Sequence, residues 1–262
     1  MPLIQNNPRI KNLDKILPII EMYPCLQGEG QFEGRPIFAL RTTGCTHRCH
    51  FGAGGWCDTW YSSIHADKGK YTFNDFVRLT EQYPHIKEIM VTGGSPTMHP
   101  AILNELSHFA HQHKIFVTLE TEGSHFIETN YPLDFISLSP KFSNSTPKLG
   151  IKTPLEKVVD DKFIQQHHKY RLNHDAISKM LAYHLDYQIK PVWDGSEKTL
   201  SEIKKFLFQH KIPNHKVYVM PAGQTREQLI ALYPKVMDMC LQEGFNFTGR
   251  THIIAFDDKR EV

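Results

Sequence analysis

The sequence predicts an α/β protein with a parallel sheet that is either open or curled into a barrel. Strand-like apolar runs alternate with helix-period segments along 262 residues, a length that suits one large domain. Polar and glycine-rich motifs come directly after the predicted strands. Ligands of parallel α/β folds gather at the carboxyl ends of the strands. The sequence therefore predicts one site that successive loops build together.

The predicted strands are short apolar runs bounded by polar or glycine-containing segments. In chain order they cover residues 37–40, 87–92, 115–119, 133–138, 187–192 and 217–220. An apolar stripe predicts a helix over 102–110. Capping-box spacings predict further helix starts at Thr72 with Asp75, Thr199 with Glu202, and Thr225 with Gln228. Helices between consecutive strands are the connections that a parallel sheet requires.

Residues 150–185 interrupt this alternation. They are polar and rich in histidine and lysine, and they contain one predicted helix over 174–184. We expect a surface excursion here rather than a second domain. The predicted organisation is a single domain over 1–262 with an insertion at about 145–185.

Charge and composition exclude several classes of protein. The 30 basic and 28 acidic residues give a formal net charge of +2, so no overall field recruits nucleic acid or a membrane. Residues 1–20 lack the pattern of a secretory signal, and no apolar run approaches the roughly 20 residues that span a bilayer. The 5 cysteines do not form a secreted disulfide framework. We expect a cytoplasmic protein with no direct nucleic-acid or membrane partner.

The segment GCTHRCHFGAGGWCDTW carries Cys45, Cys49 and Cys57. These neighbouring thiols cannot pair as disulfides without leaving one over. A tetrahedral zinc site would need a fourth ligand, which His47 or His50 offers. A four-iron cluster held by three thiolates would instead leave one iron open to bind a small molecule. The cysteines alone leave both interpretations open.

Together with the segments around it, this motif resembles that of the radical AdoMet enzymes, whose usual signature is Cys–x3–Cys–x2–Cys with an aromatic residue before the last cysteine. Here Trp56 precedes Cys57, but the spacing is Cys–x3–Cys–x7–Cys. Residues 92–96, TGGSP, resemble the family's GGEP motif, which holds the methionyl group of AdoMet, and Ser95 replaces its glutamate. The resemblance implies a partial, open (β/α) barrel with a [4Fe–4S] cluster on the three cysteines and AdoMet at the open iron.

Further motifs, in order along the chain, resemble those of 7-carboxy-7-deazaguanine synthases. They are CLQGEGQFEG at 25–34, RPIFALRTTGC at 35–45, CDT at 57–59, LETEGS at 119–124 where the family has ETNG, SLSPK at 137–141, VMPAGQT at 219–225 and FDDKREV at 256–262. The resemblance implies ring contraction of 6-carboxy-5,6,7,8-tetrahydropterin to 7-carboxy-7-deazaguanine with loss of ammonia, in queuosine-type 7-deazapurine biosynthesis. It implies no classical catalytic acid or base.

The same resemblance assigns ligands to residues of this chain. The implied substrate-binding set, in which Gln27 and Glu29 would read the pterin edge and Arg41 would pair with the carboxylate, is Leu26, Gln27, Gly28, Glu29, Arg41, Thr92 and Val262. The implied AdoMet-binding set is Trp56, Cys57, Asp58, Gly93, Gly94, Ser95, Glu120, Ser139, Pro140, Lys141 and Pro221. Thr59 would supply one oxygen to Mg²⁺, a hard cation that usually keeps few protein ligands.

The C-terminal residues 245–262 are expected to close the active site. The family also implies a homodimer and a flavodoxin or ferredoxin as the electron donor. Two other readings remain. A non-catalytic iron–sulfur or zinc-binding module would explain the cysteines but not the motifs around them. A radical AdoMet activase of a partner protein would have no evident need for the LQGEG motif.

Overall fold

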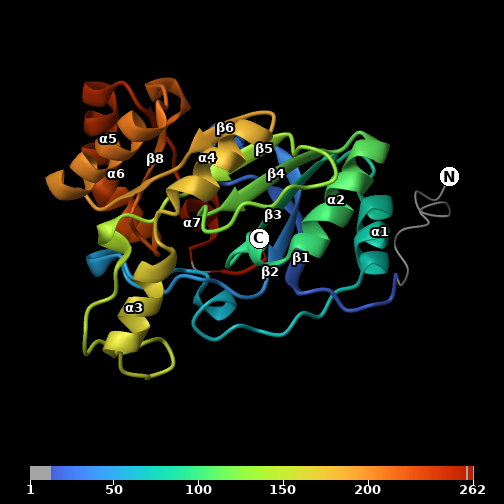
Figure 1. Cartoon of the computed structure of the whole chain (residues 1–262), viewed down its shortest axis with the longest axis horizontal. Helices are drawn as coiled ribbons and strands as arrows, with labels where there is room; N and C mark the ends of the chain where they lie inside the picture. The colour runs from blue at the N-terminus through green and yellow to red at the C-terminus, as the bar shows by residue number, and fades with distance from the viewer. Residues whose placement is uncertain (1–12, 258, 262) are drawn as a thin grey trace.

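The structure, a computed structural model, describes residues 13–257 and 259–261, so Val262 of the expected substrate-binding set lies outside the described residues. Its strands form two sheets, with the orders β1-β2-β3-β4-β5-β6 and β7-β8-β9 (Figure 1). The strands are β1 Ile19–Leu26, β2 Pro36–Thr42, β3 Glu88–Gly93, β4 Phe116–Thr121, β5 Phe135–Leu138, β6 Tyr187–Ile189, β7 Val192–Trp193, β8 Tyr218–Pro221 and β9 Asn246–Phe247.

The paired strands run parallel except β1, which lies antiparallel to β2. An isolated parallel bridge between Ile189 and Val217 joins the two sheets. Within the described chain, β1 and β9 are outer strands that do not pair with each other, so the wall of strands stays open. The predicted fold class, an α/β protein with a partial and open barrel, is confirmed.

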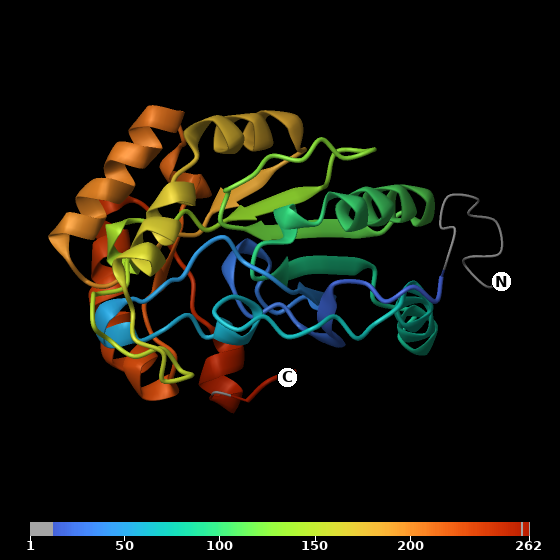
Figure 2. The same ribbon diagram turned by 60° about the horizontal axis from the view of Figure 1, so that its bottom comes forward.

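Helices cover the outside of this wall. α1 and α2 lie at one end of the molecule, and α5 and α6 lie at the opposite end (Figures 1 and 2). The helices are α1 Phe73–Gln82, α2 Pro100–His113, α3 Asp161–Tyr170, α4 His174–Tyr183, α5 Glu197–His210, α6 Arg226–Glu243 and α7 Thr251–Phe256. Short 3₁₀ helices cover Gly30–Phe32, Gly52–Gly54, Trp60–Ser62, Pro96–Met98, Ser143–Ser145 and Asn214–Lys216. No helix in the part of the chain that the structure describes is long and apolar enough to cross a membrane.

The strand predictions differ from the structure at three places, one of which is β9, a strand with no predicted counterpart. The predicted strand over 187–192 is wrong as one element, because β6 ends at Ile189 and β7 begins at Val192. Pro191 lies between them and has no N–H to donate to a neighbouring strand. β1 has no predicted counterpart. Its Pro24 argues against a strand, but β1 is at the edge of the sheet, where proline is tolerated.

Two of the three predicted helix starts are confirmed. Thr72 with Asp75, and Thr225 with Gln228, form complete capping boxes at the N-termini of α1 and α6. The prediction at Thr199 is wrong, because Ser196 caps α5 and accepts the N–H of Thr199. Glu202 takes no part in the cap, and its carboxylate accepts hydrogen bonds from the backbone N–H and the hydroxyl of Ser143.

The segment expected to be an insertion contains the predicted helix α4 and a second helix, α3, that has no predicted counterpart. Asp160 caps α3 by accepting the N–H of Phe163. Ile177 and Met180 of α4 are buried in the main apolar core. That this segment is an insertion stays a prediction.

The strands divide their side chains between two faces, since successive residues of a strand point to opposite sides. On one face, apolar side chains pack against the helices to form the main core, among them Phe38, Leu40, Ile89, Val91, Val117, Leu119, Ile136, Leu138, Ile189 and Val219. On the other face, Ile37, Ala39 and Met90 form a small separate apolar cluster, and the polar or charged positions include Arg41, Thr92, Glu120, Ser137 and Lys190. That second face holds the candidate site.

Candidate active site

A pocket of about 620 Å³ opens on the inner face of the strands. This volume lies within the range of small-molecule and cofactor sites. Most of the expected ligand-binding residues line it together, namely Leu26, Gln27, Gly28, Glu29, Arg41, Cys45, Cys49, Trp56, Cys57, Asp58, Thr59, Thr92, Gly93, Gly94, Glu120, Ser139 and Lys141. Ser95, Pro140 and Pro221 are not among the lining residues. The sequence motifs that follow different strands thus meet in one place.

Buried ion pairs form one wall of the pocket. The Nζ of Lys190 lies 2.6 Å from Glu29 Oε2 and 2.7 Å from Glu120 Oε1. The other oxygen of Glu29 accepts a hydrogen bond of 2.8 Å from Nε of Arg250. Burial works to raise the pKa of Glu29, but Lys190 and Arg250, with a smaller effect of His252, hold it well below its ordinary value. Glu29 is therefore an anion that two cations fix in position.

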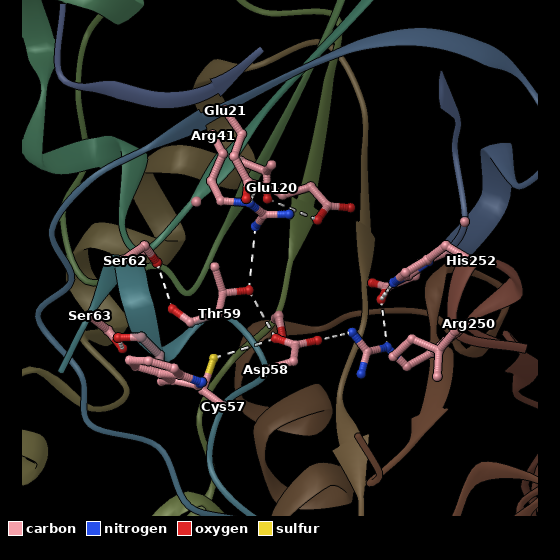
Figure 3. A pocket seen from close by; sticks show the side chains of 18 of the residues that line it. Glu21, Arg41, Cys57, Asp58, Thr59, Ser62, Ser63, Glu120, Arg250 and His252 are labelled. Carbon is pink, nitrogen blue, oxygen red and sulfur yellow. Dashed lines mark hydrogen bonds and ion pairs between the residues drawn. The ribbon is translucent and has the colours of Figure 1, made fainter. Parts of the chain in front are cut away.

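A chain of hydrogen bonds crosses the pocket from β2 to α7 (Figure 3). Arg41 donates to Thr59 Oγ1 over 3.4 Å, and Thr59 donates to Asp58 Oδ1 over 2.9 Å. The second oxygen of Asp58 pairs with Arg250. Burial works against the ionised form of Asp58, yet Arg250 lowers its pKa. The Thr59 hydroxyl thus lies between a guanidinium group and a carboxylate.

Glu21 anchors the far end of this chain. Its Oε2 accepts from Arg41 Nε over 2.5 Å, and its Oε1 accepts from Arg260 over 2.9 and 2.8 Å. The Arg260 guanidinium also lies 3.4 Å from the centre of the Tyr61 ring, a cation–π contact. Residues of the C-terminal segment, Lys259, Arg260 and Glu261, line the pocket. The segment expected to close the site therefore reaches the site.

Cys45, Cys49 and Cys57 are free thiols on the pocket wall. A backbone hydrogen bond of 3.0 Å from the N–H of Cys57 to the carbonyl of Cys49 folds the long spacer back on itself. Burial raises the pKa of Cys49 to about 12 and that of Cys57 to about 11. Burial, with the nearby Glu122 carboxylate, also raises the pKa of Cys45. Such thiols ionise when a bound metal takes up the thiolate.

The three free thiols are ligands of the kind that iron–sulfur clusters use. Within residues 13–257 and 259–261, no three His, Cys, Asp or Glu side chains are grouped so that they could hold one metal ion. In a four-iron cluster each cysteine binds a different iron, so the sulfurs do not have to converge on one point. Three thiols on the wall of one pocket, with none of them paired as a disulfide, suit that requirement.

Gly93, the last residue of β3, and Gly94 have a packing role that the sequence did not indicate. A Cβ at Gly93 would collide with the backbone of Thr42, and a Cβ at Gly94 would collide with the carbonyl oxygens of Gly44 and Ser62. The N–H of Gly94 also donates to the Thr42 carbonyl over 3.3 Å. These glycines bring the end of β3 against the start of the cysteine loop.

Ser95, which follows them, points away from solvent into a group of polar side chains. Its hydroxyl donates to Glu122 Oε1 over 2.5 Å. The same oxygen accepts from the Thr46 hydroxyl over 3.2 Å and from the Ser124 hydroxyl. Burial works to raise the pKa of Glu122, whereas His47 and the hydroxyls of Ser124 and Ser95 lower it, and the net direction is downward. Glu122 is thus a buried carboxylate that lines the pocket.

His47 and Lys141 complete this side of the pocket. The pKa of His47 is lowered to about 4, first by burial and then by cations that include Lys141, against the attraction of Glu122. A neutral His47 is therefore expected near pH 7. Lys141 donates to the carbonyl and the hydroxyl of Ser139 over 2.8 and 2.7 Å, so the SPK motif closes on itself.

Sequence reasoning missed four functional candidates: Glu21, Glu122, Lys190 and Arg250. Two of them carry a signal in retrospect. Lys190 follows β6 and continues its alternation of side chains onto the inner face. Glu122, two residues after Glu120, does the same after β4. Arg250 belongs to no motif, and its pairing with Glu29 and Asp58 depends on contacts about two hundred residues apart that left no local pattern.

No protein-family profile matches the chain. Several curated proteins are similar to the chain in sequence. A 7-carboxy-7-deazaguanine synthase of Halobacterium salinarum is 30% identical over 255 residues, which cover 94% of this chain and 93% of that protein. One from Rhodopirellula baltica is 30% identical over 246 residues, which cover 93% and 88%. The crystal structure of QueE from Escherichia coli aligns with 90% of this chain at a TM-score of 0.60 and 18% identity, which supports the fold.

Proposed function

The chain belongs to the 7-carboxy-7-deazaguanine synthase family, and from that premise we propose that it converts 6-carboxy-5,6,7,8-tetrahydropterin to 7-carboxy-7-deazaguanine with loss of ammonia. The reaction is a step of queuosine-type 7-deazapurine biosynthesis, and the enzyme is a carbon–nitrogen lyase. One observation carries the proposal. The three cysteines and most of the residues expected to bind AdoMet and the carboxypterin line a single pocket.

Cys45, Cys49 and Cys57 would hold a [4Fe–4S] cluster. The loops after β3, β4 and β5, with Gly93, Gly94 and the SPK motif, would hold AdoMet beside it. When bound, the two cofactors supply the reductive cleavage of AdoMet and the hydrogen abstraction that starts the rearrangement. The protein's own part is to bind, orient and exclude water.

Arg41 and Thr59 orient the acidic end of the substrate. A carboxylate that enters between them would meet the guanidinium group of Arg41 and a Mg²⁺ ion on the Thr59 hydroxyl. Thr59 donates its proton to Asp58 and accepts a hydrogen bond from Arg41, which leaves one lone pair of its hydroxyl for the cation. Mg²⁺ would fill the rest of its shell with substrate oxygens and water.

Glu29 and Gln27 read the opposite edge of the substrate. Lys190 and Arg250 already occupy both oxygens of Glu29, but a carboxylate oxygen accepts more than one hydrogen bond. The donors of the pterin ring can therefore share Glu29 without displacing the two cations. Because those cations keep Glu29 ionised, it acts as an acceptor rather than as a proton donor.

The C-terminal segment, residues 245–262, closes the pocket in this proposal. Arg260 fastens it to Glu21, and Arg250 fastens its base to Glu29 and Asp58. Closure of this kind keeps water from the reacting groups. The cytoplasm as the location, a homodimer, and a flavodoxin or ferredoxin as the electron donor belong to the same proposal and rest on the family resemblance.

Release of 5′-deoxyadenosine tests the function against both alternatives. The reconstituted protein is incubated without oxygen with AdoMet, Mg²⁺ and a reductant, with and without the carboxypterin. We expect release that depends on the carboxypterin and needs no partner protein. An activase would require its protein substrate. A zinc module would show neither release nor the brown chromophore of an iron–sulfur cluster.

A further inference from the structure

Glu122 is a buried anion with one oxygen unused. The residue is 6% exposed, and it lines the pocket. Its Oε1 accepts hydrogen bonds from the hydroxyls of Ser95, Ser124 and Thr46. Its Oε2 is buried and has no hydrogen-bond partner among the described residues. An unsatisfied buried polar atom is costly, and a buried carboxylate is costlier still, so the arrangement calls for a donor from outside the chain.

Among residues 13–257 and 259–261, no lysine or arginine pairs with Glu122. The donors that reach Glu122 are neutral hydroxyls, and Nδ1 of His47 lies 3.9 Å from Oε1, beyond hydrogen-bond distance. The same Nδ1 is already hydrogen-bonded to Thr46 over 2.9 Å. Glu29 and Glu120, which also line the pocket, differ from Glu122 in this respect, because Lys190 pairs with both.

The position of Glu122 beside the cysteine loop indicates which ligand would donate a hydrogen bond to its Oε2. Glu122 hydrogen-bonds Ser95, which directly follows Gly93 and Gly94, and Thr46, which directly follows Cys45 in the chain. In the TGGSP segment, Ser95 stands where the resembled motif has a glutamate. In the LETEGS segment, Glu122 stands where the resembled motif has an asparagine. The acidic residue thus stands in the LETEGS segment of this chain, whereas the resembled motif has it in the segment that corresponds to TGGSP.

We propose that Glu122, held by Ser95, accepts hydrogen bonds from the α-amino group of AdoMet and replaces the glutamate that Ser95 displaces. The inference rests on the proposed function, since it assumes that AdoMet binds in this pocket. Ser95 and Ser124 hold Oε1 of the carboxylate, so Oε2 is the oxygen that would accept from the amino group of AdoMet. Glu122 is in this account a ligand-binding residue, not an acid or base.

The test compares two ligands on the reconstituted protein by equilibrium dialysis. One is AdoMet, and the other is its 2-oxo analogue, which keeps the sulfonium and carboxylate groups but lacks the amino group. We expect Glu122→Gln to raise the Kd for AdoMet about ten- to a hundredfold, because the charged hydrogen bond to its amino group is lost. Binding of the 2-oxo analogue should stay within about threefold, because it has no amino group to place.

Glu120→Gln is the matched control, since Glu120 lies two residues earlier on the same face. Glu120→Gln should change the Kd for AdoMet and the Kd for the 2-oxo analogue by the same factor. Ser95→Ala keeps the carboxylate and removes one donor, so it tests the proposal even if Glu122→Gln takes up no cluster. This variant should raise the Kd for AdoMet a few-fold and leave the Kd for the 2-oxo analogue unchanged. Iron per chain and far-ultraviolet circular dichroism report whether each variant folds and loads.

The outcomes separate this inference from the function. Loss confined to AdoMet supports the role of Glu122. Equal loss of both ligands, or no loss in either variant, shows that Glu122 only braces the loops and overturns the inference while the function stands. A loaded parent protein that binds no AdoMet overturns both.

Discussion

The ammonium group of Lys190 and the carboxylate of Glu29, 161 residues apart in the chain, form a buried ion pair of 2.6 Å. The pair joins the end of β6 to the loop after β1. Lys190 is 3% exposed and Glu29 is 8% exposed, so neither group is solvated by bulk water. Arg250 holds the remaining oxygen of Glu29, and the polar wall of the pocket is thereby fixed before a ligand arrives.

Replacing Arg250 should destabilise the fold. Arg250→Met leaves Glu29 and Asp58 buried with a partner missing, which typically costs about 3–5 kcal/mol. Urea unfolding followed by circular dichroism measures the loss. Arg35→Met is the control, because Arg35 pairs with Glu88 but its side chain is 47% exposed. An exposed pair of this kind contributes about 0–1 kcal/mol. Equal losses in the two variants would contradict the assignment of a buried network.

Removing the Thr59 hydroxyl should weaken the response to magnesium. We expect Thr59→Ala to raise the Mg²⁺ concentration for half-maximal turnover by at least about tenfold, by analogy with other losses at metal sites. Thr59→Ser keeps the hydroxyl and should resemble the parent. Iron content should be unchanged in both, since Thr59 would not bind the cluster. An unchanged magnesium curve in Thr59→Ala would refute the role.

Protonation of His184 should destabilise the protein as the pH falls. Burial lowers the pKa of His184 to about 4, and its Nδ1 accepts the N–H of Leu133 over 3.0 Å. The unfolded chain titrates near pH 6.5, so it takes up more protons than the fold below that pH. The stability that neutral His184 contributes is complete above about pH 6.5 and is lost toward pH 4, by about 1.4 kcal/mol per pH unit.

Comparison of His184→Gln with the parent isolates this effect. Gln keeps an acceptor for Leu133 but does not titrate, so its unfolding free energy should fall less steeply between pH 6.5 and 4. His85→Gln, at an exposed position, should follow the parent curve. Parallel curves for parent and His184→Gln would show that His184 does not carry the pH dependence.

Releasing the C-terminal segment from Glu21 should weaken the binding of the substrate more than the binding of AdoMet. Arg260→Ala removes both hydrogen bonds to Glu21 and the contact with Tyr61. We expect the KM for the carboxypterin to rise about three- to tenfold, in line with one or two lost charged hydrogen bonds at a partly exposed site. The Kd for AdoMet should stay nearly constant. Arg78→Ala on α1, an exposed residue, is the control. A matching change in both constants would argue against closure by this segment.

Local rules predicted much of the fold. The capping boxes at Thr72 and Thr225 and the apolar strands were readable because each depends on neighbours a few residues away. Pro191 ended one predicted strand early, and Ser196 took the capping role expected of Thr199. β9, with only two residues, and α7, with no side-chain cap, left no comparable local signal.

The site was predictable as a set of loops but not as a network. Cys45, Thr59 and Arg41 carried recognisable motifs, and the structure brings them to one pocket. Lys190 and Arg250 belong to no motif, and their partners were fixed only when the sheet brought distant segments together. Glu122 was visible as part of LETEGS, but its unsatisfied oxygen became apparent only with Ser95, Ser124 and Thr46 around it.

The most direct test of the central claim is the product of a complete reaction. The reconstituted protein is incubated anaerobically with 6-carboxy-5,6,7,8-tetrahydropterin, AdoMet, Mg²⁺ and a reductant, and the mixture is analysed by mass spectrometry together with an ammonia assay. The account predicts 7-carboxy-7-deazaguanine and one ammonia for each carboxypterin consumed, and no product when Cys45 is replaced by alanine. Unchanged carboxypterin in the presence of a fully loaded cluster and bound AdoMet would contradict it.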